Sequence, residues 1–454
     1  MAVEHTYRYL HESTYVAGEG LGLATAGGRV DNPYFFRGFV ENADQVARAL
    51  LVVAEVARTR YFDAGVASRM RDPVVTSNRS VLRIESFSAC NGVYARFDLD
   101  NAGFECDQLD WGTTNVDVNE PLRAALTGIG AGDPLRMSVG SEALQVDTLD
   151  ESIVEKKVPL PDRWLKGFAE VQIASSGMMQ VADLGTAAAR AALRDLPLQK
   201  TGNRTMWVAF SKSGARLTQR SDGTSPSLVG PQRLAALRRL LPFARRLDVF
   251  AEPTRNRQPT GGRAASVEAP RASAWVIELD SARMTLVISP ELYRGFSGEG
   301  AVLEALAAAD DHAVADVASR LVGQANLDPN TLCAETSATL PQVMDALRVL
   351  GAAGRVGHDV RADGFFHRDL PFDRSTLEAM QPRLRDASDL VSGGAVHHAD
   401  DRCLVESEGT TYTVRVTPDG STCTCVWFAK HRGERGPCKH VLAAQLAIVR
   451  AGHQ

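Results

Sequence analysis

The sequence predicts a multidomain α+β protein, and three features of the chain support this fold class. The 454 residues suffice for two to four domains of about 100–200 residues each. Short β-type segments and helices alternate through the first two thirds, helical periodicity dominates the next part, and cysteine gathers in the tail. We therefore expect mixed, β-rich N-terminal and middle domains, a helical domain, and a linker leading into a small tail domain, at residues 1–200, 201–297, 298–385 and 386–454.

The composition excludes several classes of protein. With 44% hydrophobic and 23% charged residues, the chain fits neither global disorder nor a membrane-embedded protein. No apolar run reaches the roughly 18 residues that cross a bilayer, and no secretory signal is visible. Seven cysteines favour a reducing compartment, so we expect a cytoplasmic protein with no membrane partner. A net charge of -5 means that any nucleic-acid contact must be local.

The N-terminal domain combines helical and strand patterns. Apolar residues at helical spacing predict a helix over 43–59. The pattern predicts further strands at 81–85, 93–99, 135–139, 144–147 and 154–158, and further helices at 121–129, 164–173 and 186–196. Polar residues alternate at Thr113, Asn115, Asp117 and Asn119, which we interpret as a solvated strand face rather than a ligand site.

The middle domain shows a similar order of elements. Strands are expected at 206–210, 215–219, around 249, 275–279 and 284–288, with a helix at 232–241. Two passes of strands, helix and strands suggest an internal duplication, although no residue-level repeat is visible. The segment 253–273 is rich in Pro, Gly, Ser and Arg and is expected to be a mobile loop.

This domain also carries the strongest local charge. Residues 231–271 hold nine arginines against three acidic residues. Arginine suits bidentate contacts with phosphate or carboxylate. The pattern leaves open a solvated face or a site for an acidic partner or nucleic acid. The candidate contact residues are Arg238, Arg239, Arg245 and Arg246.

From about residue 298 the pattern indicates a compact helical unit. The expected helices lie at 302–306, 312–322, 332–334 and 340–350, and two short strands follow at 356–360 and 365–368. Helices followed by a hairpin resemble a winged helix-turn-helix domain, whose third helix enters the DNA major groove in DNA-binding members. Between residues 337 and 370, four arginines and four aspartates cancel, which gives little counterion release on DNA. We therefore favour protein interaction over DNA reading for this winged-helix-like unit.

The tail holds the most specific pattern in the chain. Cys423 and Cys425 lie two residues apart on an extended segment, so both thiols face one side. Cys438 and His440 follow Pro437 at the entrance to a helical run. Three thiolates and one imidazole complete a tetrahedral Zn2+ shell with no open position, which indicates a structural ion rather than a catalytic one.

Two further residues near the tail are alternative ligands. Cys403 precedes the first of two expected strands, at 404–408 and 411–416, and we interpret it as a strand residue. His431 lies in the loop between the two ligand pairs, and we interpret it as a solvated residue.

The C-x-C…C-x-H pattern, after a β-hairpin and before a helix, resembles the SWIM zinc finger over about residues 401–454. The resemblance implies a module that binds DNA or protein, without catalysis. Basic residues near the ligands partly balance the negative charge of a three-thiolate site, and they are also candidate contacts for phosphate or an acidic partner. These residues are Lys430, Arg432, Arg435 and Lys439.

The order of features along the whole chain is similar to that of bacterial SWIM proteins whose genes accompany MoxR-type AAA+ ATPases and von Willebrand factor A proteins. The features are the segments 32–36 and 111–117, the winged-helix-like unit and the finger. This resemblance implies a protein partner from such a system.

Motifs for catalysis are missing from the sequence. No G-x-G-x-x-G, Gly-Lys-Ser/Thr, G-x-S-x-G or H-E-x-x-H pattern occurs. The polar segment 397–401 could hold a catalytic metal, but it follows Ser392-Gly393-Gly394 and we interpret it as an interdomain linker. We expect a zinc-binding, non-enzymatic adaptor that contacts protein or nucleic acid. The alternative is a DNA-binding transcriptional or transposase-like regulator.

Overall fold

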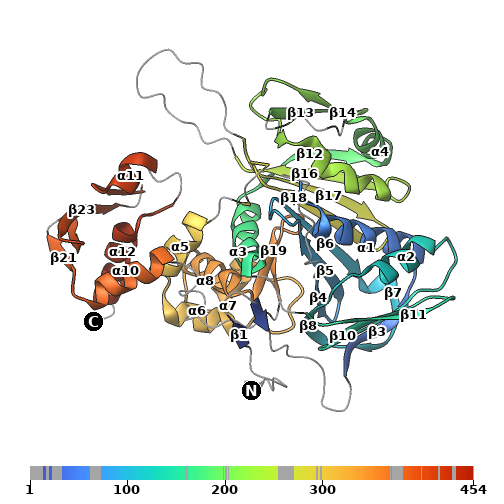
Figure 1. Ribbon diagram of the computed structural model, residues 1–454, viewed down its shortest axis with the longest axis horizontal. Coiled ribbons are helices and arrows are strands. Elements are labelled where there is room, and N and C mark those ends of the chain that lie inside the picture. Colours follow the sequence, from blue (N-terminus) through green and yellow to red (C-terminus); the bar gives the residue numbers. More distant parts are fainter. Residues whose placement is uncertain are drawn as a thin grey trace.

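The computed structural model of the protein contains large β-sheets flanked by helices, then a helical group, then a small C-terminal sheet (Figure 1). The predicted multidomain α+β fold class is confirmed. The structure describes residues 14–16, 20–22, 33–61, 73–158, 162–197, 199, 202, 204–253, 270–292, 295–296, 299–368, 370, 382–399, 401–417, 420–431 and 436–452. Most of the expected loop 253–273 therefore lies outside the described residues.

The first group of elements is built on the predicted helix α1, which packs against β5, β6 and α2. A five-stranded sheet has the order β11-β10-β9-β3-β7, and β4, β5, β6 and β8 join a second, larger sheet. The elements of the first group are β3 (Tyr34–Val40), α1 (Ala43–Arg58), β4 (Val74–Asn78), β5 (Val81–Phe87), β6 (Val93–Asp100), η1 (Asn101–Gly103), β7 (Phe104–Leu109), β8 (Trp111–Asn115), α2 (Glu120–Gly128), β9 (Arg136–Gly140), β10 (Ala143–Asp147) and β11 (Ser152–Lys156). Near the N-terminus, β1 (Thr14–Val16) pairs with β2 (Gly20–Gly22).

The second group repeats the outline of the first. In the first group β3 precedes a helix and pairs antiparallel with β9, which begins the meander β9-β10-β11. In the second, β12 precedes helix α4 and pairs antiparallel with β16, which begins the meander β16-β17-β18. This topology supports the suggested duplication. The elements are β12 (Met179–Gly185), α4 (Thr186–Asp195), β13 (Thr205–Ser211), β14 (Gly214–Thr218), β15 (Ser227–Val229), η2 (Pro231–Leu240), β16 (Arg246–Ala251), β17 (Ser273–Leu279) and β18 (Ala282–Ile288).

One sheet joins the two groups. β18 pairs antiparallel with β6, which gives an eight-stranded sheet in the order β12-β16-β17-β18-β6-β5-β4-β8. Buried residues of α1, α2, η2 and both large sheets form one continuous apolar core. Because this core crosses from one group to the other, the two groups stabilise each other.

The helix expected at 232–241 is present as the 3-10 helix η2, and its buried Arg233 donates to the backbone oxygens of Val229 and Ser289. One sequence expectation in this region is wrong in part. The predicted polar face is not solvated at Thr113 and Asn115, which are fully buried, although Asn119 at its other end is exposed. Thr113 lies 3.2 Å from the Thr76 hydroxyl, so neighbouring polar groups replace the water that the pattern had implied.

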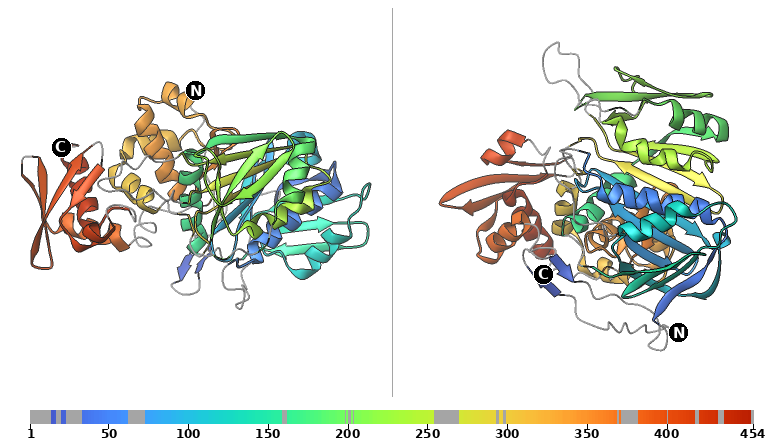
Figure 2. Two further views of the ribbon diagram at one scale, coloured as in Figure 1. Left: turned by 90° about the horizontal axis from the view of Figure 1, so that it is seen from above. Right: turned by 45° about the vertical axis from the view of Figure 1, so that its right-hand side comes forward.

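The helical group lies between the large sheets and the C-terminal sheet (Figure 2). α6, α7 and α8 precede the hairpin β19–β20, which matches the winged-helix-like expectation. The long helix α3 packs against α5 and α8. The elements are α3 (Asp162–Ser176), α5 (Glu299–Ala308), α6 (Asp311–Ala318), α7 (Pro329–Glu335), α8 (Leu340–Ala352), β19 (Val356–Asp359) and β20 (Gly364–His367).

The C-terminal group is a four-stranded antiparallel sheet covered by one helix. The strand order is β21-β22-β23-β24, and α12 packs against the sheet, α5 and α10. The elements are α10 (Pro382–Ser392), β21 (Val396–Ala399), β22 (Arg402–Ser407), β23 (Thr410–Thr417), β24 (Gly420–Cys423), α11 (Val426–His431) and α12 (Lys439–Gly452). Residues 396–399 thus form an edge strand, and the linker prediction is wrong for His397 and His398.

Candidate metal centre

The four predicted ligands converge from three elements of the C-terminal group. Cys423 ends β24, and Cys425 follows two residues later, directly before α11. Cys438 precedes α12 and His440 lies in its first turn. The extended backbone places the first two thiols on one side, as the sequence pattern predicted. All four side chains are buried.

Their geometry fits a tetrahedral metal ion. The four candidate ligand atoms lie within 4.8 Å of one another. A tetrahedron with metal–sulfur bonds of about 2.3 Å has sulfur–sulfur edges of about 3.8 Å, so a small ion fits between them. The donor set of three sulfurs and one nitrogen suits Zn2+. Within the described residues, no other group of three or more His, Cys, Asp or Glu side chains has this proximity.

Local hydrogen bonds favour thiolates at this site. The backbone N–H of Cys425 donates to Cys423 Sγ, and the N–H of Phe428 donates to Cys425 Sγ, each over 3.4 Å. Hydrogen bonding from Cys423 lowers the pKa of Cys438 to about 4, whereas burial raises the pKa of Cys425. Without an ion, the crowded thiols therefore cannot all ionise, and a divalent cation would replace the protons that they share.

His440 is oriented by an aromatic neighbour. Its Nδ1 lies 3.8 Å from Cys423 Sγ, and its ring stacks on Tyr412 with the centroids 4.1 Å apart. Its Nε2 is buried and has no hydrogen-bond partner in the described part of the chain. Nδ1 is thus the nitrogen that faces the thiols, and Tyr412 holds the ring in that orientation.

The sequence model of the SWIM zinc finger matches residues 412–448, a range that holds all four ligands. This segment is a SWIM zinc finger. The comparison with curated proteins found no match. The finger type implies a zinc-binding interaction module, and the buried three-cysteine, one-histidine site is consistent with zinc. Among the described helices, none has the length and apolarity needed to cross a membrane.

Solved structures give only distant similarities. The proliferating cellular nuclear antigen of Entamoeba histolytica is 9% identical, covers 56% of this chain and 98% of its own, and has a TM-score of 0.36. A chain of the PCNA2–PCNA3 complex of Sulfolobus tokodaii is 10% identical, covers 56% of this chain and 99% of its own, and has a TM-score of 0.37. A chain of the complex between the C-terminal region of FEN-1 and A. fulgidus PCNA is 10% identical, covers 56% of this chain and 97% of its own, and has a TM-score of 0.34.

The alternative ligands lie outside the metal cluster. Cys403 is a buried residue of β22, as the sequence interpretation held, and burial raises its pKa. His431 ends α11, where its ring lies 4.4 Å from the Trp427 ring. Neither belongs to the group of four ligands.

The predicted basic contacts of the finger are in different situations. Lys430 is exposed on α11. Lys439 forms a 2.7 Å ion pair with Glu408, which ties the β22–β23 turn to the start of α12. Arg432 and Arg435 lie outside the described residues. Lys430 is therefore the described residue of this set that is most accessible to a partner.

The four arginines of the middle domain all have partners inside the chain. Arg238 donates to the backbone oxygens of Leu193, Arg194 and Leu196 at the end of α4. The other three form ion pairs with carboxylates: Arg239 with Glu55, Arg245 with Asp280, and Arg246 with Asp183 and Asp248. An external ligand would have to compete with these contacts, so the prediction that they bind a partner stays a prediction.

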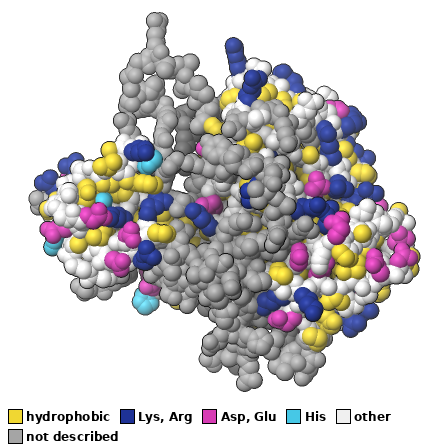
Figure 3. Space-filling view, viewed as in Figure 1, with side chains coloured by type: hydrophobic (Ala, Val, Ile, Leu, Met, Phe, Trp, Pro, Cys, Tyr) yellow, Lys and Arg dark blue, Asp and Glu magenta, His cyan; other side chains and the backbone are white. Residues whose placement is uncertain are grey.

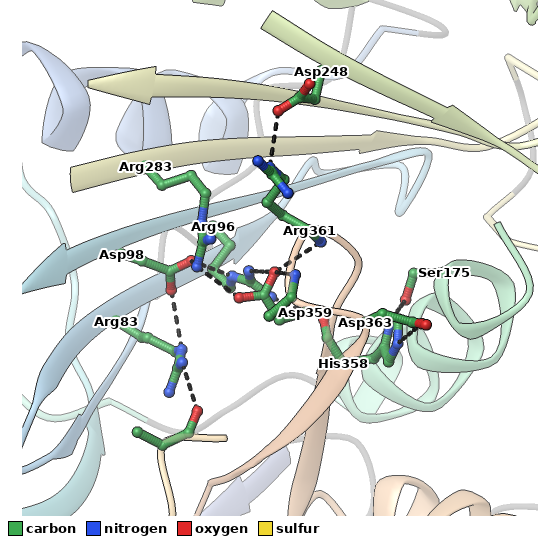
Figure 4. Close-up of polar contacts among 12 residues, drawn as sticks. Arg83, Arg96, Asp98, Ser175, Asp248, Arg283, His358, Asp359, Arg361 and Asp363 are labelled. Atoms are coloured by element: carbon green, nitrogen blue, oxygen red, sulfur yellow. Dashed lines mark hydrogen bonds and ion pairs between the residues drawn. The ribbon is translucent and has the colours of Figure 1, made fainter. Parts of the chain in front are cut away.

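A buried ion-pair network joins the winged-helix-like hairpin to the eight-stranded sheet (Figure 4). Asp359 of β19 accepts from Arg96 of β6 over 2.9 Å and from Arg283 of β18 over 2.6 Å. Asp98 also pairs with Arg96 and, over 3.0 Å, with Arg83. Although burial opposes ionisation, these arginines hold the pKa of Asp359 well below its usual range. We call this set, together with the ion pairs of Arg361 and Arg368, the wing network.

Two more arginines complete the wing network. Arg361, in the hairpin turn, lies 2.9 Å from Asp248 of β16, and Arg368 lies 2.7 Å from Glu85 of β5. The Arg368 guanidinium also lies over the Phe168 ring of α3, at 3.8 Å. The sequence interpretation missed this network, because its only visible signal was the balance of four arginines and four aspartates in 337–370. Two members of that balance, Asp359 and Arg368, are buried and pair with residues far away along the chain, whereas Arg348 and Asp345 form a local, partly exposed pair.

The finger is seated on the helical group by α10. Arg383 donates to the backbone oxygen of Pro437 over 3.0 Å and lies over the Trp427 ring at 5.1 Å. Buried residues of α5, α8, α10, α12 and the finger sheet form one apolar cluster that includes the three ligand cysteines. The position of α11 therefore depends on both the ligand pairs and α10.

Proposed function

We propose that this protein is a zinc-stabilised, non-enzymatic adaptor that binds another protein through its C-terminal finger. The observation that carries the proposal is the closed set of four buried ligands. Catalytic zinc sites keep one position open for water or substrate, whereas four protein ligands leave none. The ion would then act by fixing the shape of the finger.

The surface that this shape would present is α11. Val426, directly after the ligand Cys425, is 81% exposed, the highest exposure of any large apolar residue in the described chain. Lys430 is exposed on the same helix, and Trp427 and Phe428 are half-buried beneath it. Val426 and Lys430 are therefore the residues of α11 through which the proposed contact would be made.

The packing of the winged-helix-like unit also favours a protein partner. Its third helix, α8, buries Val343, Leu347 and Leu350 and is covered by α3, α5 and α6. The hairpin β19–β20 is held against the sheet by the wing network. This packing leaves less of α8 and of the hairpin exposed for contact with a DNA groove, which supports a protein partner in the proposal.

The finer part of the proposal concerns the partner. The order of features along the sequence resembles that of bacterial SWIM proteins, and on this resemblance we propose a MoxR-type AAA+ ATPase or a von Willebrand factor A protein as that partner, in the cytoplasm. Such a complex needs no catalytic residue from the adaptor.

The test is affinity capture of the full chain with nuclease-treated extract, together with co-expression of a MoxR-type ATPase and a von Willebrand factor A protein from the same cell. We expect a specific partner that Val426→Asp loses while zinc content stays at one ion per chain. Leu149→Asp is the matched control, because Leu149 is 70% exposed but lies in the first group of elements. Equal capture by both variants would exclude α11 as the contact surface.

A further inference from the structure

A second surface, outside the finger, is set apart by its charge. Residues 186–246 contain twelve Arg and Lys against two Asp, a net charge of +10. The chain as a whole carries -5, so the remaining residues carry -15. We call residues 186–246 the basic module. It comprises α4, β13, β14, β15 and η2, and a three-stranded sheet in the order β14-β13-β15 forms its outer part. Lys and Arg side chains gather over this part of the molecule (Figure 3).

Four cations of the basic module are exposed and unpaired. Within the described residues, the side chains of Arg204, Lys212, Arg216 and Arg220 make no hydrogen bond or ion pair. The two acidic residues are already engaged, because Asp195 pairs with Arg194 and Asp222 accepts from the backbone N–H groups of Thr224 and Ser225. The positive charge of the four cations is therefore not neutralised inside the chain.

The hairpin β13–β14 spreads these cations along a line. Ser211 pairs with Gly214, so Lys212 lies in the two-residue turn at one end. Trp207 pairs with Thr218, which places Arg204 and Arg220 at the other end, with Arg216 between. Seven strand residues at about 3.4 Å each span about 24 Å. Such a line matches an extended polyanion better than a single phosphate or carboxylate.

The amount of exposed apolar surface distinguishes between two kinds of polyanion, an acidic protein and a nucleic acid. Protein interfaces bury an apolar or aromatic centre. None of the large apolar residues exposed in the described chain lies in the basic module. Val208, Phe210 and Leu217 of the hairpin face the main core instead. A regular backbone of phosphates requires no apolar contact, because release of its counterions drives binding.

We propose that the β13–β14 hairpin of the basic module and its flanking residues bind the phosphate backbone of nucleic acid through Arg204, Lys212, Arg216 and Arg220. The contact is independent of base sequence, because contacts to phosphate oxygens carry no sequence information directly. The acidic remainder of the chain repels nucleic acid and confines it to this face. This activity goes beyond the proposed adaptor function and does not require the finger.

The test is fluorescence anisotropy of the full, zinc-loaded chain with a short labelled duplex DNA of arbitrary sequence, over a series of salt concentrations. We expect binding that weakens with salt. The change of all four cations to Gln should lower affinity at least tenfold and flatten the slope of log K against log salt by about 3–4. Circular dichroism and zinc content should not change.

A matched control carries the same change of net charge at another place. Arg37, Lys156, Arg402 and Arg415 are exposed and lie outside the basic module, and their change to Gln should leave DNA affinity within about twofold. Equal weakening by both sets would overturn the proposal, as would absence of duplex binding at low salt. Binding of poly-glutamate as tight as that of the duplex would assign the surface to an acidic protein and also overturn it. Val426→Asp should retain DNA binding. A failure of the adaptor proposal can therefore be distinguished from a failure of the DNA-binding proposal.

Discussion

The C-terminal finger and the β19–β20 hairpin are both small β elements, but different interactions hold them in place. In the finger, four ligands from residues 423–440 surround a site for one ion, so the stabilising contacts are local in sequence. In the hairpin, Asp359 pairs with Arg96 and Arg283, far away along the chain. The finger thus depends on an external ion, whereas the hairpin depends on charges that the chain itself supplies.

Removal of the ion should have the largest effect of all. Structural zinc contributes about 10–16 kcal/mol of apparent binding free energy in finger peptides, so chelation should unfold residues 401–452. We expect limited proteolysis to cut this segment first, with the large sheets left intact. Cys438→Ser should reproduce the effect, whereas Cys403→Ala, a buried cysteine outside the cluster, should retain one zinc by elemental analysis. A zinc-free chain with a protease-resistant finger would contradict this prediction.

The wing network should respond next. Asp98→Asn leaves the buried Arg83 without its charged partner and leaves Arg96 with Asp359 alone, which should lower the free energy of unfolding by about 3–5 kcal/mol. Asp110→Asn removes only the surface pair with Arg79 and should cost less than about 1 kcal/mol. Urea denaturation measures both. Zinc content should not change in either variant, and a loss of zinc with Asp98→Asn would show that the two regions are coupled.

As the pH falls, the β19–β20 hairpin should lose stability at a higher pH than the large sheets do. Burial lowers the pKa of His358 to about 4 and that of His367 to about 3, so the folded chain resists their protonation. Stability is therefore complete above about pH 6.5 and decreases as the pH falls towards 4, by about 3 kcal/mol for His358. His358 faces Ser175, Asp363 and Arg96. Replacement of both His358 and His367 by Gln should flatten the dependence of unfolding free energy on pH. An unchanged dependence would contradict the assignment of this effect to the two histidines.

The smallest effect separates two neighbouring arginines. Arg238→Ala leaves three backbone oxygens at the end of α4 without their donor and should cost roughly 1–3 kcal/mol. Arg239→Ala removes only a partly exposed pair with Glu55 and should cost less than about 1 kcal/mol. Equal effects in urea denaturation would show that helix capping by Arg238 is no stronger than a surface pair.

The finger was predictable from the sequence because its ligands are close together along the chain. A spacing of two residues, a loop and a second spacing of two define the site without knowledge of the rest of the fold. The same holds for α1, whose apolar periodicity appears within one segment. Local patterns of this kind carry their own structural information.

The wing network was not predictable, because each pair joins residues that are far apart in sequence. Arg96 gives no sign, within its strand, that its partner is Asp359. The burial of Thr113 and Asn115 was missed for a related reason, since alternation of polar residues also occurs where a second element covers the strand.

The hairpin has a consequence for how the protein is made. While the ribosome is still adding residues beyond 298, the sheet already contains Arg96 and Arg283, but Asp359 has not been synthesised. A nascent chain at this stage has only Asp98 to pair with both guanidinium groups, whereas the finished molecule adds the carboxylate of Asp359, so we expect this edge of the sheet to be less stable until the hairpin is made. Recombinant fragments that stop near residue 297 should share this defect, and the boundary between sheets and helices is a poor place to divide the gene.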